Sequence, residues 1–349
     1  MSTDYSFMIN DLLDWYDENA RELPWRNQSN PYYTWVSEIM LQQTRVEAVK
    51  GYFTRFIETL PTIQALADAK PDQLLKLWEG LGYYNRVRNM QKAAITVVEE
   101  FNGELPKDYK ALLSLSGIGT YTAGAIASIA YKLPVPAVDG NVLRVTKRLT
   151  GSYDDITLPK VKKELEEDML KIMPATRSGD LNQALMDLGA TICIPNGKPL
   201  CQECPLNHKC KAFQENLTAE LPVKSSKKAR KIEDKTIILF SCQGKYALHK
   251  RMDKGLLASL WEFPNIEESL PLSKFEELLD EHGIKDYSLE LLGPAKHIFS
   301  HVEWHMIGYR VTIETNDIDL FEDLVWVTKE QVNKEYAIPT AFKAYTMQL

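Results

Sequence analysis

The stretch Leu115-Ser-Gly-Ile-Gly-Thr-Tyr-Thr-Ala-Gly-Ala125 places two glycines, Gly117 and Gly119, between two segments of helical character. A Gly-x-Gly turn lets the backbone N–H groups at the start of the second helix face outward, where an anion can bind. Alone, the pair is typical of an ordinary turn between helices. The apolar residues around it favour a helix–hairpin–helix motif of the kind that contacts a DNA backbone; they are Leu112, Leu115, Ile118 and Ala123.

Outward from this turn, residues 7–214 predict a chain of short helices. Apolar residues recur at helical spacing, as at Leu74, Leu75, Leu77 and Trp78, and Gly or Pro interrupts the successive runs. The sequence of this part shows no alternating pattern that would indicate a sheet. We therefore expect a mostly α N-terminal domain over residues 1–214.

The composition changes over residues 215–234. The stretch 224–231, Lys-Ser-Ser-Lys-Lys-Ala-Arg-Lys, is basic and poor in large apolar side chains. It predicts a solvated linker, with an arm that tracks DNA as the alternative. Beyond it the apolar period changes to two. Residues 235–349 therefore predict a separate α+β domain, with strands in 235–241, 246–251, 305–313 and 324–327 and a helix over 273–282.

Charge alone does not decide whether the chain binds nucleic acid. The whole chain has 41 Lys and Arg against 48 Asp and Glu, and residues 235–349 hold 12 and 18 of these. The remainder is near neutral, and such a domain can bind a polyanion where its cations share one face. The first twenty residues lack the pattern of a signal peptide, and no apolar run is long enough to span a bilayer. We expect a reducing, cytoplasmic setting.

Four of the five cysteines have the spacing Cys193-x7-Cys201-x2-Cys204-x5-Cys210. Four thiolates so close in sequence suit a 4Fe–4S cluster or a zinc ion. Zinc usually takes two close pairs with a longer gap between them, whereas here one close pair lies between two longer arms, which favours an iron–sulfur loop. Two disulfides are the remaining alternative and fit a reducing setting poorly. The fifth cysteine, Cys242, ends an apolar run and is expected to be buried.

Two carboxyl groups are candidates for catalysis. Asp139 follows a helix-breaking region and should cap the next helix, whose positive end would keep it ionised. Beside a DNA-binding hairpin, such a carboxylate can also stabilise a cationic sugar. Glu38 lies on an otherwise apolar helix with Gln42 four residues on, so this stripe either lines a cleft or faces solvent. A carboxyl group against apolar walls has a raised pKa and can act as a general acid.

Together these features resemble the endonuclease III superfamily and, within it, the MutY-type adenine DNA glycosylases. The likeness runs from about residue 23 to 210 and, more loosely, through a C-terminal domain that resembles the Nudix-like fold of this family. It implies one 4Fe–4S cluster and a monomer that acts, in the cytoplasm and at the nucleoid, on duplex DNA with adenine opposite 8-oxoguanine or guanine. The residues that carry it are Glu38 in Ser-Glu-Ile-Met-Leu-Gln-Gln-Thr, the Gly117-x-Gly119 hairpin, Val-Asp139-Gly-Asn and the cysteine loop.

The resemblance also implies a mechanism. Glu38 would protonate N7 of an adenine flipped out of the duplex, and Asp139 would stabilise an oxocarbenium-like sugar. Tyr121 and Asn141 would position Asp139 and the sugar. Because Tyr121 occupies the position at which the lyase branch carries a Schiff-base lysine, we expect a monofunctional glycosylase. The alternatives are a bifunctional glycosylase/lyase of the endonuclease III type and a non-catalytic DNA-binding iron–sulfur protein.

Further residues match family positions that contact the DNA or the lesion. Core packing is the alternative interpretation for Tyr83, and an ordinary surface charge is the alternative for Arg26. The C-terminal domain lacks the full Arg and Glu set of a metal–diphosphate site, so we expect no hydrolase activity there. The first cysteine gap has seven residues, where the family usually has six. The predicted contact residues are Arg26, Gln43, Thr44, Leu81, Tyr83, Gly117, Gly119, Phe299, Ser300 and His301.

Overall fold

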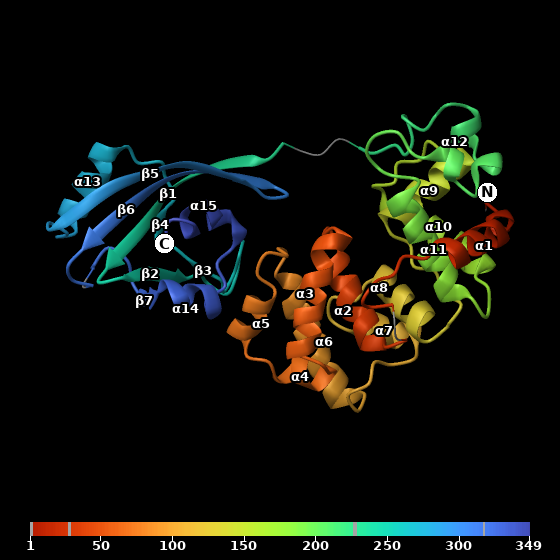
Figure 1. The fold of residues 1–349 in the computed structure, drawn as a ribbon, viewed down its shortest axis with the longest axis horizontal. Helices are drawn as coiled ribbons and strands as arrows, with labels where there is room; N and C mark the ends of the chain where they lie inside the picture. Colours follow the sequence, from red (N-terminus) through yellow and green to blue (C-terminus); the bar gives the residue numbers. More distant parts are fainter. Residues whose placement is uncertain (1–2, 27–28, 226–228, 317) are drawn as a thin grey trace. The chain divides into compact units, whose positions relative to one another are not determined.

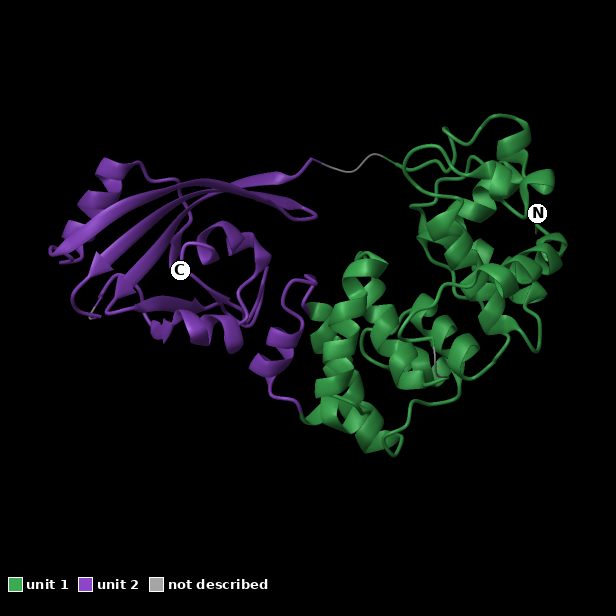
Figure 2. Cartoon of the chain, viewed as in Figure 1, with its two compact units in different colours: residues 1–68, 85–226 green, residues 69–84, 227–349 purple. Residues whose placement is uncertain are grey.

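The computed structural model describes residues 3–26, 29–225, 229–316 and 318–349. It divides into two compact units: residues 1–68 with 85–226, and residues 69–84 with 227–349 (Figure 2). The second unit therefore contains a short helical segment from the first half of the chain, which the sequence pattern does not distinguish from the helices around it. Among the described residues, no helix is long and apolar enough to cross a membrane.

The first unit is built from helices (Figure 1). Apolar side chains of α1, α9, α10 and α11 gather in one core, against which Cys193, Cys204 and Cys210 also pack. The helices are α1 Ile9–Asn19, α2 Pro31–Leu41, α3 Val46–Thr59, α4 Ile63–Asp68, α6 Asn85–Glu100, α7 Tyr109–Ser114, α8 Thr120–Ala125, α9 Gly140–Thr150, α10 Pro159–Ile172, α11 Ser178–Thr191 and α12 Lys211–Gln214. Single 3-10 turns lie at Ser6–Met8, Cys201–Glu203 and Asn207–Lys209.

The predicted hairpin forms between α7 and α8. Gly117 has a φ of +76°, and a Cβ there would lie 2.7 Å from the Cβ of Asn89. Both constraints favour glycine at this position. Gly119 is the N-cap of α8, which continues into a π-helix over Ile126–Ala130. The predicted helix–hairpin–helix motif is thus present, and it is followed by a π turn, a feature often found at functional sites.

The segment that leads into α9 is held in place from α11. Asn182, which is buried, accepts a hydrogen bond from the N–H of Ala137 at 3.0 Å. Its side-chain amide donates to the carbonyl of Val135 at 2.9 Å and to the hydroxyl of Ser128 at 2.8 Å. Because a buried amide that is fully hydrogen-bonded resists displacement, the chain has a defined path towards Asp139.

The second unit contains α5 (Pro71–Leu77) and a seven-stranded mixed sheet. The strand order is β3-β2-β1-β6-β5, with β4 paired to β1 and β7 paired to β2; β1 and β6 run parallel, and the other pairs are antiparallel. The strands are β1 Lys231–Cys242, β2 Lys245–Lys250, β3 Trp261–Glu262, β4 Asn265–Ile266, β5 Tyr287–Ile298, β6 Val302–Ile313 and β7 Val325–Thr328. The helices are α13 Leu272–Glu281, α14 Lys329–Lys334 and α15 Lys343–Thr346, with a 3-10 turn at Thr340–Phe342.

Alternate side chains of β1 enter two cores on opposite faces of the sheet. Ile237 and Leu239 join the core that α14 and α15 cover, whereas Ile238 and Phe240 join the core that α13 covers (Figure 1). A strand buried on both faces explains the continuous apolar run in the sequence. Cys242, at the end of this strand, is buried as predicted.

The strand β5 is absent from the predicted strands. It lies at the edge of the sheet, and its pairing with β6 shifts register between Leu291 and Gly293. Pro294 follows directly. An edge strand with a bulge, a glycine and a proline shows little of the alternation by which strands are recognised in sequence.

The predicted linker begins against the first unit. The backbone N–H of Ser225 donates to Asp155 at 3.0 Å, and the N–H of Ile156 donates to the carbonyl of Val223 at 3.1 Å. Residues 226–228 of the predicted linker lie outside the described residues. Strand β1 already begins at Lys231, four residues before the C-terminal domain was expected to start.

Candidate active site

Glu38 lies on α2, a helix whose start is well determined by its sequence. Asn30 is the N-cap and accepts from the N–H groups of Tyr32 and Tyr33, and Pro31 follows at the first helical position. Glu38 is 5 % exposed, so the solvent-facing alternative is wrong. Its carboxylate accepts a hydrogen bond from the hydroxyl of Tyr121.

The pKa of Glu38 is raised to about 7. Burial is the largest cause, and the negative charge of Asp139 acts in the same direction. The hydrogen bond from Tyr121 and the positive charge of Arg26 oppose both. A carboxyl group with this pKa is partly protonated at neutral pH and can therefore donate a proton, as the sequence analysis expected.

Asp139 is the N-cap of α9, as predicted. Its Oδ1 accepts from the N–H of Val142 at 2.8 Å, and its Oδ2 accepts from Nδ2 of Asn141 at 2.7 Å. Its pKa is nevertheless raised, because burial outweighs these two hydrogen bonds. The sequence indicated the helix end, which favours the ionised form, but burial that opposes it is visible only in the folded chain.

The position of Asn141 is fixed by an arginine that sequence reasoning did not single out. Arg144 donates from Nη2 to Oδ1 of Asn141 at 2.8 Å and to the carbonyl of Gly189 at 2.7 Å. Its Nε donates to the carbonyl of Cys193 at 2.8 Å. A signal was available, since Arg144 follows Asn141 by three residues and therefore shares its face of α9.

The hydroxyl of Tyr121 donates to Glu38. Burial, together with the negative charges of both carboxyl groups, raises the pKa of Tyr121 well above its ordinary value, so the hydroxyl stays protonated and acts as a donor. Arg26 is paired with Asp187 of α11 at 2.7 Å. The structure thus brings Glu38, Tyr121, Asp139 and Arg26 into one electrostatically coupled group.

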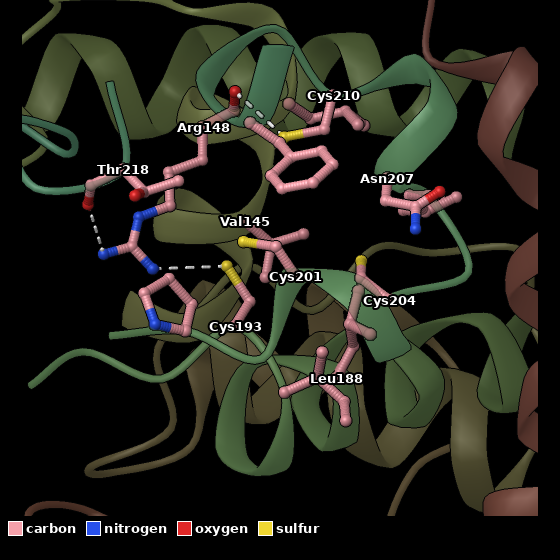
Figure 3. A pocket seen from close by; sticks show the side chains of 14 residues that line it. Val145, Arg148, Leu188, Cys193, Cys201, Cys204, Asn207, Cys210 and Thr218 are labelled. Atoms are coloured by element: carbon pink, nitrogen blue, oxygen red, sulfur yellow. Dashed lines mark hydrogen bonds between the residues drawn. The ribbon is translucent and has the colours of Figure 1, made fainter. Parts of the chain in front are cut away.

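The four cysteines of the loop line one pocket (Figure 3). None of the five cysteines forms a disulfide, which excludes the disulfide alternative for this structure. Arg148 donates from Nη1 to the sulfur of Cys193 at 3.4 Å, and the sulfur of Cys210 donates to the carbonyl of Arg148 at 3.6 Å. The loop is closed by the N–H of Leu200, which donates to the carbonyl of Ile192 at 3.0 Å. The seven-residue gap is therefore accommodated.

The four cysteines provide the thiol ligands of a candidate metal centre. Within the described ranges, no three His, Cys, Asp or Glu side chains converge on a point that could hold a single metal ion. Four thiolates suit either a zinc ion or a 4Fe–4S cluster. Burial also raises the pKa of Cys204 to about 12 and that of Cys210. Thiolates in this pocket therefore need a cationic centre.

Two predicted lesion contacts meet within the second unit. Tyr83 is 50 % exposed, and its hydroxyl lies 2.8 Å from the hydroxyl of Ser300, which is 217 positions away in sequence. Core packing is therefore the wrong interpretation for Tyr83, although it is correct for the neighbouring Tyr84, which is buried. Leu81 is also buried in this structure.

The predicted loop 299–301 is the turn that joins β5 to β6. The N–H of Phe299 donates to the carbonyl of Val302 at 2.8 Å, and the ring of Phe299 packs edge-on against Trp304 with centroids 4.8 Å apart. Ser300 and His301 are exposed at the tip. The aromatic side chain thus anchors the turn while the two polar side chains face outward.

Gln43 and Thr44 form the turn after α2. Gln43 is exposed and has a φ of +60°, which is uncommon for a residue with a Cβ. Arg86, near the start of α6, donates from Nη1 to the carbonyls of Ile39 at 2.6 Å and Gln42 at 2.7 Å. It thereby satisfies carbonyl groups at the end of α2 and fixes the turn that presents Gln43.

Comparison with known proteins agrees with this geometry. Residues 36–172 match the family described as HhH-GPD superfamily base excision DNA repair protein, and residues 236–348 match the NUDIX domain. The chain is 36% identical to the adenine DNA glycosylase of Mus musculus, over 89% of this chain and 72% of that protein. It is 34% identical to the adenine DNA glycosylase of Homo sapiens, over 95% of this chain and 72% of that one.

Solved structures give the same result for the helical part. A thermostable thymine-DNA glycosylase superposes with a TM-score of 0.55 at 27% identity, over 60% of this chain and 96% of that one. Endonuclease III in a trapped covalent intermediate with DNA gives 0.52 at 26% identity, over 60% and 96%. The predicted combination of a helix–hairpin–helix domain and a Nudix-like α+β domain is thus confirmed. The chain belongs to the adenine DNA glycosylase family of base-excision DNA repair enzymes.

Proposed function

We propose that this protein hydrolyses the N-glycosidic bond of an adenine mispaired with 8-oxoguanine or guanine and does not cleave the DNA backbone. The observation that carries the proposal is the buried Glu38, which accepts a hydrogen bond from Tyr121 and whose pKa is raised to about 7 by burial and by the negative charge of Asp139. Acid-catalysed glycoside hydrolysis uses two carboxyl groups that act together on the scissile bond. The relatives named above are adenine DNA glycosylases.

The reaction begins when the adenine is extruded from the stack, since its glycosidic bond is not accessible inside the duplex. Protonated Glu38 then donates its proton to N7, and the electron pair of the glycosidic bond leaves with the base. The positive charge that develops on the sugar is stabilised by the carboxylate of Asp139, which Asn141 orients. Ionised Glu38 next takes a proton from the attacking water, which leaves an abasic site and a reprotonated enzyme.

The absence of a lyase step follows from the residue at position 121. A lyase of this superfamily forms an imine through a lysine there, whereas Tyr121 is a phenol whose hydroxyl is already hydrogen-bonded to Glu38. The bifunctional alternative therefore lacks its nucleophile at this position. The non-catalytic alternative gives no purpose to the raised pKa of the buried Glu38 or to its electrostatic coupling to Asp139.

We further propose that Tyr83, Ser300 and His301 contact the base opposite the adenine, while Gln43 and Thr44 contact the duplex where the adenine is extruded. The hydrogen-bonded pair of Tyr83 and Ser300 supports the first assignment. The exposed, left-handed Gln43 supports the second. The hairpin glycines Gly117 and Gly119 would present backbone N–H groups to a phosphate.

The four cysteines that line the pocket of Figure 3 would hold one 4Fe–4S cluster. When bound, the cluster supplies a cationic centre that compensates four thiolates and fixes the loop 193–210. The chain's own contribution is the cavity and Arg148, which bonds the sulfur of Cys193. A monomer that acts on cytoplasmic, nucleoid DNA completes the proposal.

The test is a single-turnover assay on a duplex with one adenine opposite 8-oxoguanine, analysed with and without alkali. Strand cleavage only after alkali is the expected result, and cleavage before alkali would establish a lyase. Glu38→Gln and Asp139→Asn should each slow base release by about 10² to 10⁴-fold, the usual contribution of such groups. Both variants should still bind the duplex. Wild-type rates in either would refute the assigned roles, and binding without release by the wild type would favour the non-catalytic alternative.

A further inference from the structure

A buried ion cluster lies beside the carboxyl pair, and the mechanism above does not use it. Asp187, on α11, has a side chain that is 0 % exposed. It accepts hydrogen bonds from Nη1 and Nη2 of Arg26 at 2.7 and 2.9 Å, a bidentate pair. It also accepts from Nε and Nη2 of Arg21 at 2.8 and 2.5 Å and from the backbone N–H of Arg21 at 3.2 Å.

These bonds fix Arg26 in a single orientation. Its Nη1 donates in addition to the carbonyl of Arg21 at 3.3 Å, and its guanidinium lies 6.0 Å from the centre of the Tyr16 ring. In the described part of the chain, Nε of Arg26 donates to no other residue, so this N–H is among the donors that remain for a ligand. A bidentate carboxylate fixes the plane of a guanidinium in a way that a single bond does not.

The charge of Arg26 reaches the catalytic acid. The groups that face Glu38 are Tyr121 from α8, Asp139 at the start of α9 and Arg26 from the loop after α1, and Arg26 acts to lower the pKa of Glu38. Asp187 partly cancels this effect, because its carboxylate lies against the same guanidinium. An arginine without that partner would favour the ionised form of Glu38 more strongly.

We propose that Asp187 is a positioning residue for adenine excision, which holds the guanidinium of Arg26 in the orientation from which it acts on Glu38 and neutralises part of its charge. This inference rests on the proposed function, since it assigns Asp187 a role in that reaction. Asp187 acts through Arg26 and touches neither the base nor the sugar. It lies in an otherwise apolar stretch, Ala184-Leu-Met-Asp-Leu188, where a buried carboxylate without partners would destabilise the fold.

The test compares Asp187→Asn, Arg26→Gln and the double variant by single-turnover adenine release across pH. In Asp187→Asn the alkaline limb of the pH–rate profile should move to lower pH by about one unit, which lowers the rate at pH 8 about tenfold. At pH 5.5, where Glu38 is protonated in both proteins, most of the rate should return. In the Arg26→Gln background the Asp187→Asn change should add nothing, because its effect passes through Arg26.

A matched control is Asp180→Asn, the same change on the same helix at a residue paired with Arg177 at 2.9 Å. It should keep the wild-type profile. If Asp187→Asn does not fold, Asp187→Glu retains the charge and should retain the wild-type alkaline limb at a lower rate; a displaced limb there would overturn the inference. An equal loss at every pH, or additive effects in the double variant, would also overturn it. Failure of the wild type to release adenine would instead remove the proposed function itself.

Discussion

Glu38 and Asp139 carry the same functional group in two different surroundings. Glu38 lies on a helix among apolar side chains, with Tyr121 as its one hydrogen-bond donor, whereas Asp139 accepts from both the N–H of Val142 and the side chain of Asn141. Burial raises the pKa of both, but the two donors at Asp139 favour its ionised form. The pair can therefore divide into an acid and a cation stabiliser, as glycosidase carboxyl pairs do.

The raised pKa of Glu38 also makes a prediction about stability. A carboxyl group whose pKa rises from 4.5 to about 7 on folding stabilises the fold fully below pH 4.5, and this contribution is lost as the pH rises through 7. Glu38→Gln removes the titration. The free energy of unfolding of the variant minus that of the wild type should therefore be about 3 kcal/mol larger at pH 8 than at pH 4. Denaturant unfolding at both pH values measures this, and a difference independent of pH would contradict it.

At the scale of elements, the close approach of α9 and α11 determines the position of the Asn141 side chain. A Cβ added to Gly189 of α11 would lie 2.6 Å from the Cβ of Asn141 and 3.3 Å from Nη2 of Arg144. The carbonyl of the same glycine accepts from Arg144. The spacing of these two helices therefore determines where the side chain that orients Asp139 can lie.

Gly189→Ala should consequently damage catalysis. The added methyl group displaces Asn141 and destabilises the fold by about 1–3 kcal/mol, as overpacking usually does. Adenine release should fall more than duplex affinity, which single-turnover rates and binding titrations on the same duplex compare. The matched control is Gly51→Ala on α3, where the nearest atom to the new Cβ is Arg55 Nη1 at 3.6 Å. That variant should be more stable by roughly 0.5–1 kcal/mol. Wild-type activity in Gly189→Ala would show that the close approach is dispensable.

At the scale of the whole molecule, substitutions in the first unit should affect metal content, whereas substitutions in the second unit should affect discrimination of the base opposite the adenine. The cysteine pocket packs against the core of the first unit through Cys193, Cys204 and Cys210. The fifth cysteine, Cys242, lies in a core of the second unit. The cysteines that could bind a metal centre thus all lie in the first unit. A substitution at one of them can be compared with the same substitution at Cys242.

Cys204→Ser should lower the iron and acid-labile sulfide content well below about four of each per chain and destabilise the first unit. Cys242→Ser should leave both contents unchanged, because that side chain is buried in a core of the second unit. Metal and sulfide analysis of the purified proteins measures the two contents, and thermal unfolding measures the change in stability. Full iron content in Cys204→Ser, or zinc in the wild type, would contradict the cluster assignment.

The second unit should govern discrimination of the base opposite the adenine. Tyr83→Phe and Ser300→Ala each remove the hydroxyl contact between the two segments and should each reduce the preference for 8-oxoguanine over guanine about two- to tenfold, from a net hydrogen bond of roughly 0.5–1.5 kcal/mol. The double variant should lose little more than either single one. Ratios of release rates on the two duplexes give the preference, and fully additive losses would show that the pair does not act together.

The sequence by itself determined the features that depend on local backbone geometry. The glycine hairpin before α8, the N-cap at Asp139 and the cysteine spacing follow from turn conformation, helix capping and ligand chemistry, which operate within a few residues. The pattern also separated a helical part from a part with strands. The family resemblance then assigned Glu38 and Asp139 their roles, and in the structure the charge of Asp139 acts on the pKa of Glu38.

Only the tertiary structure decided which distant side chains meet. The Tyr121 bond to Glu38, the Arg26 pair with Asp187 and the Tyr83 contact with Ser300 join residues that are 83, 161 and 217 positions apart. The raised pKa of Asp139 likewise depends on burial by segments remote in sequence. Such contacts arise when separate segments pack to remove apolar surface from water, and no local period in the chain encodes them.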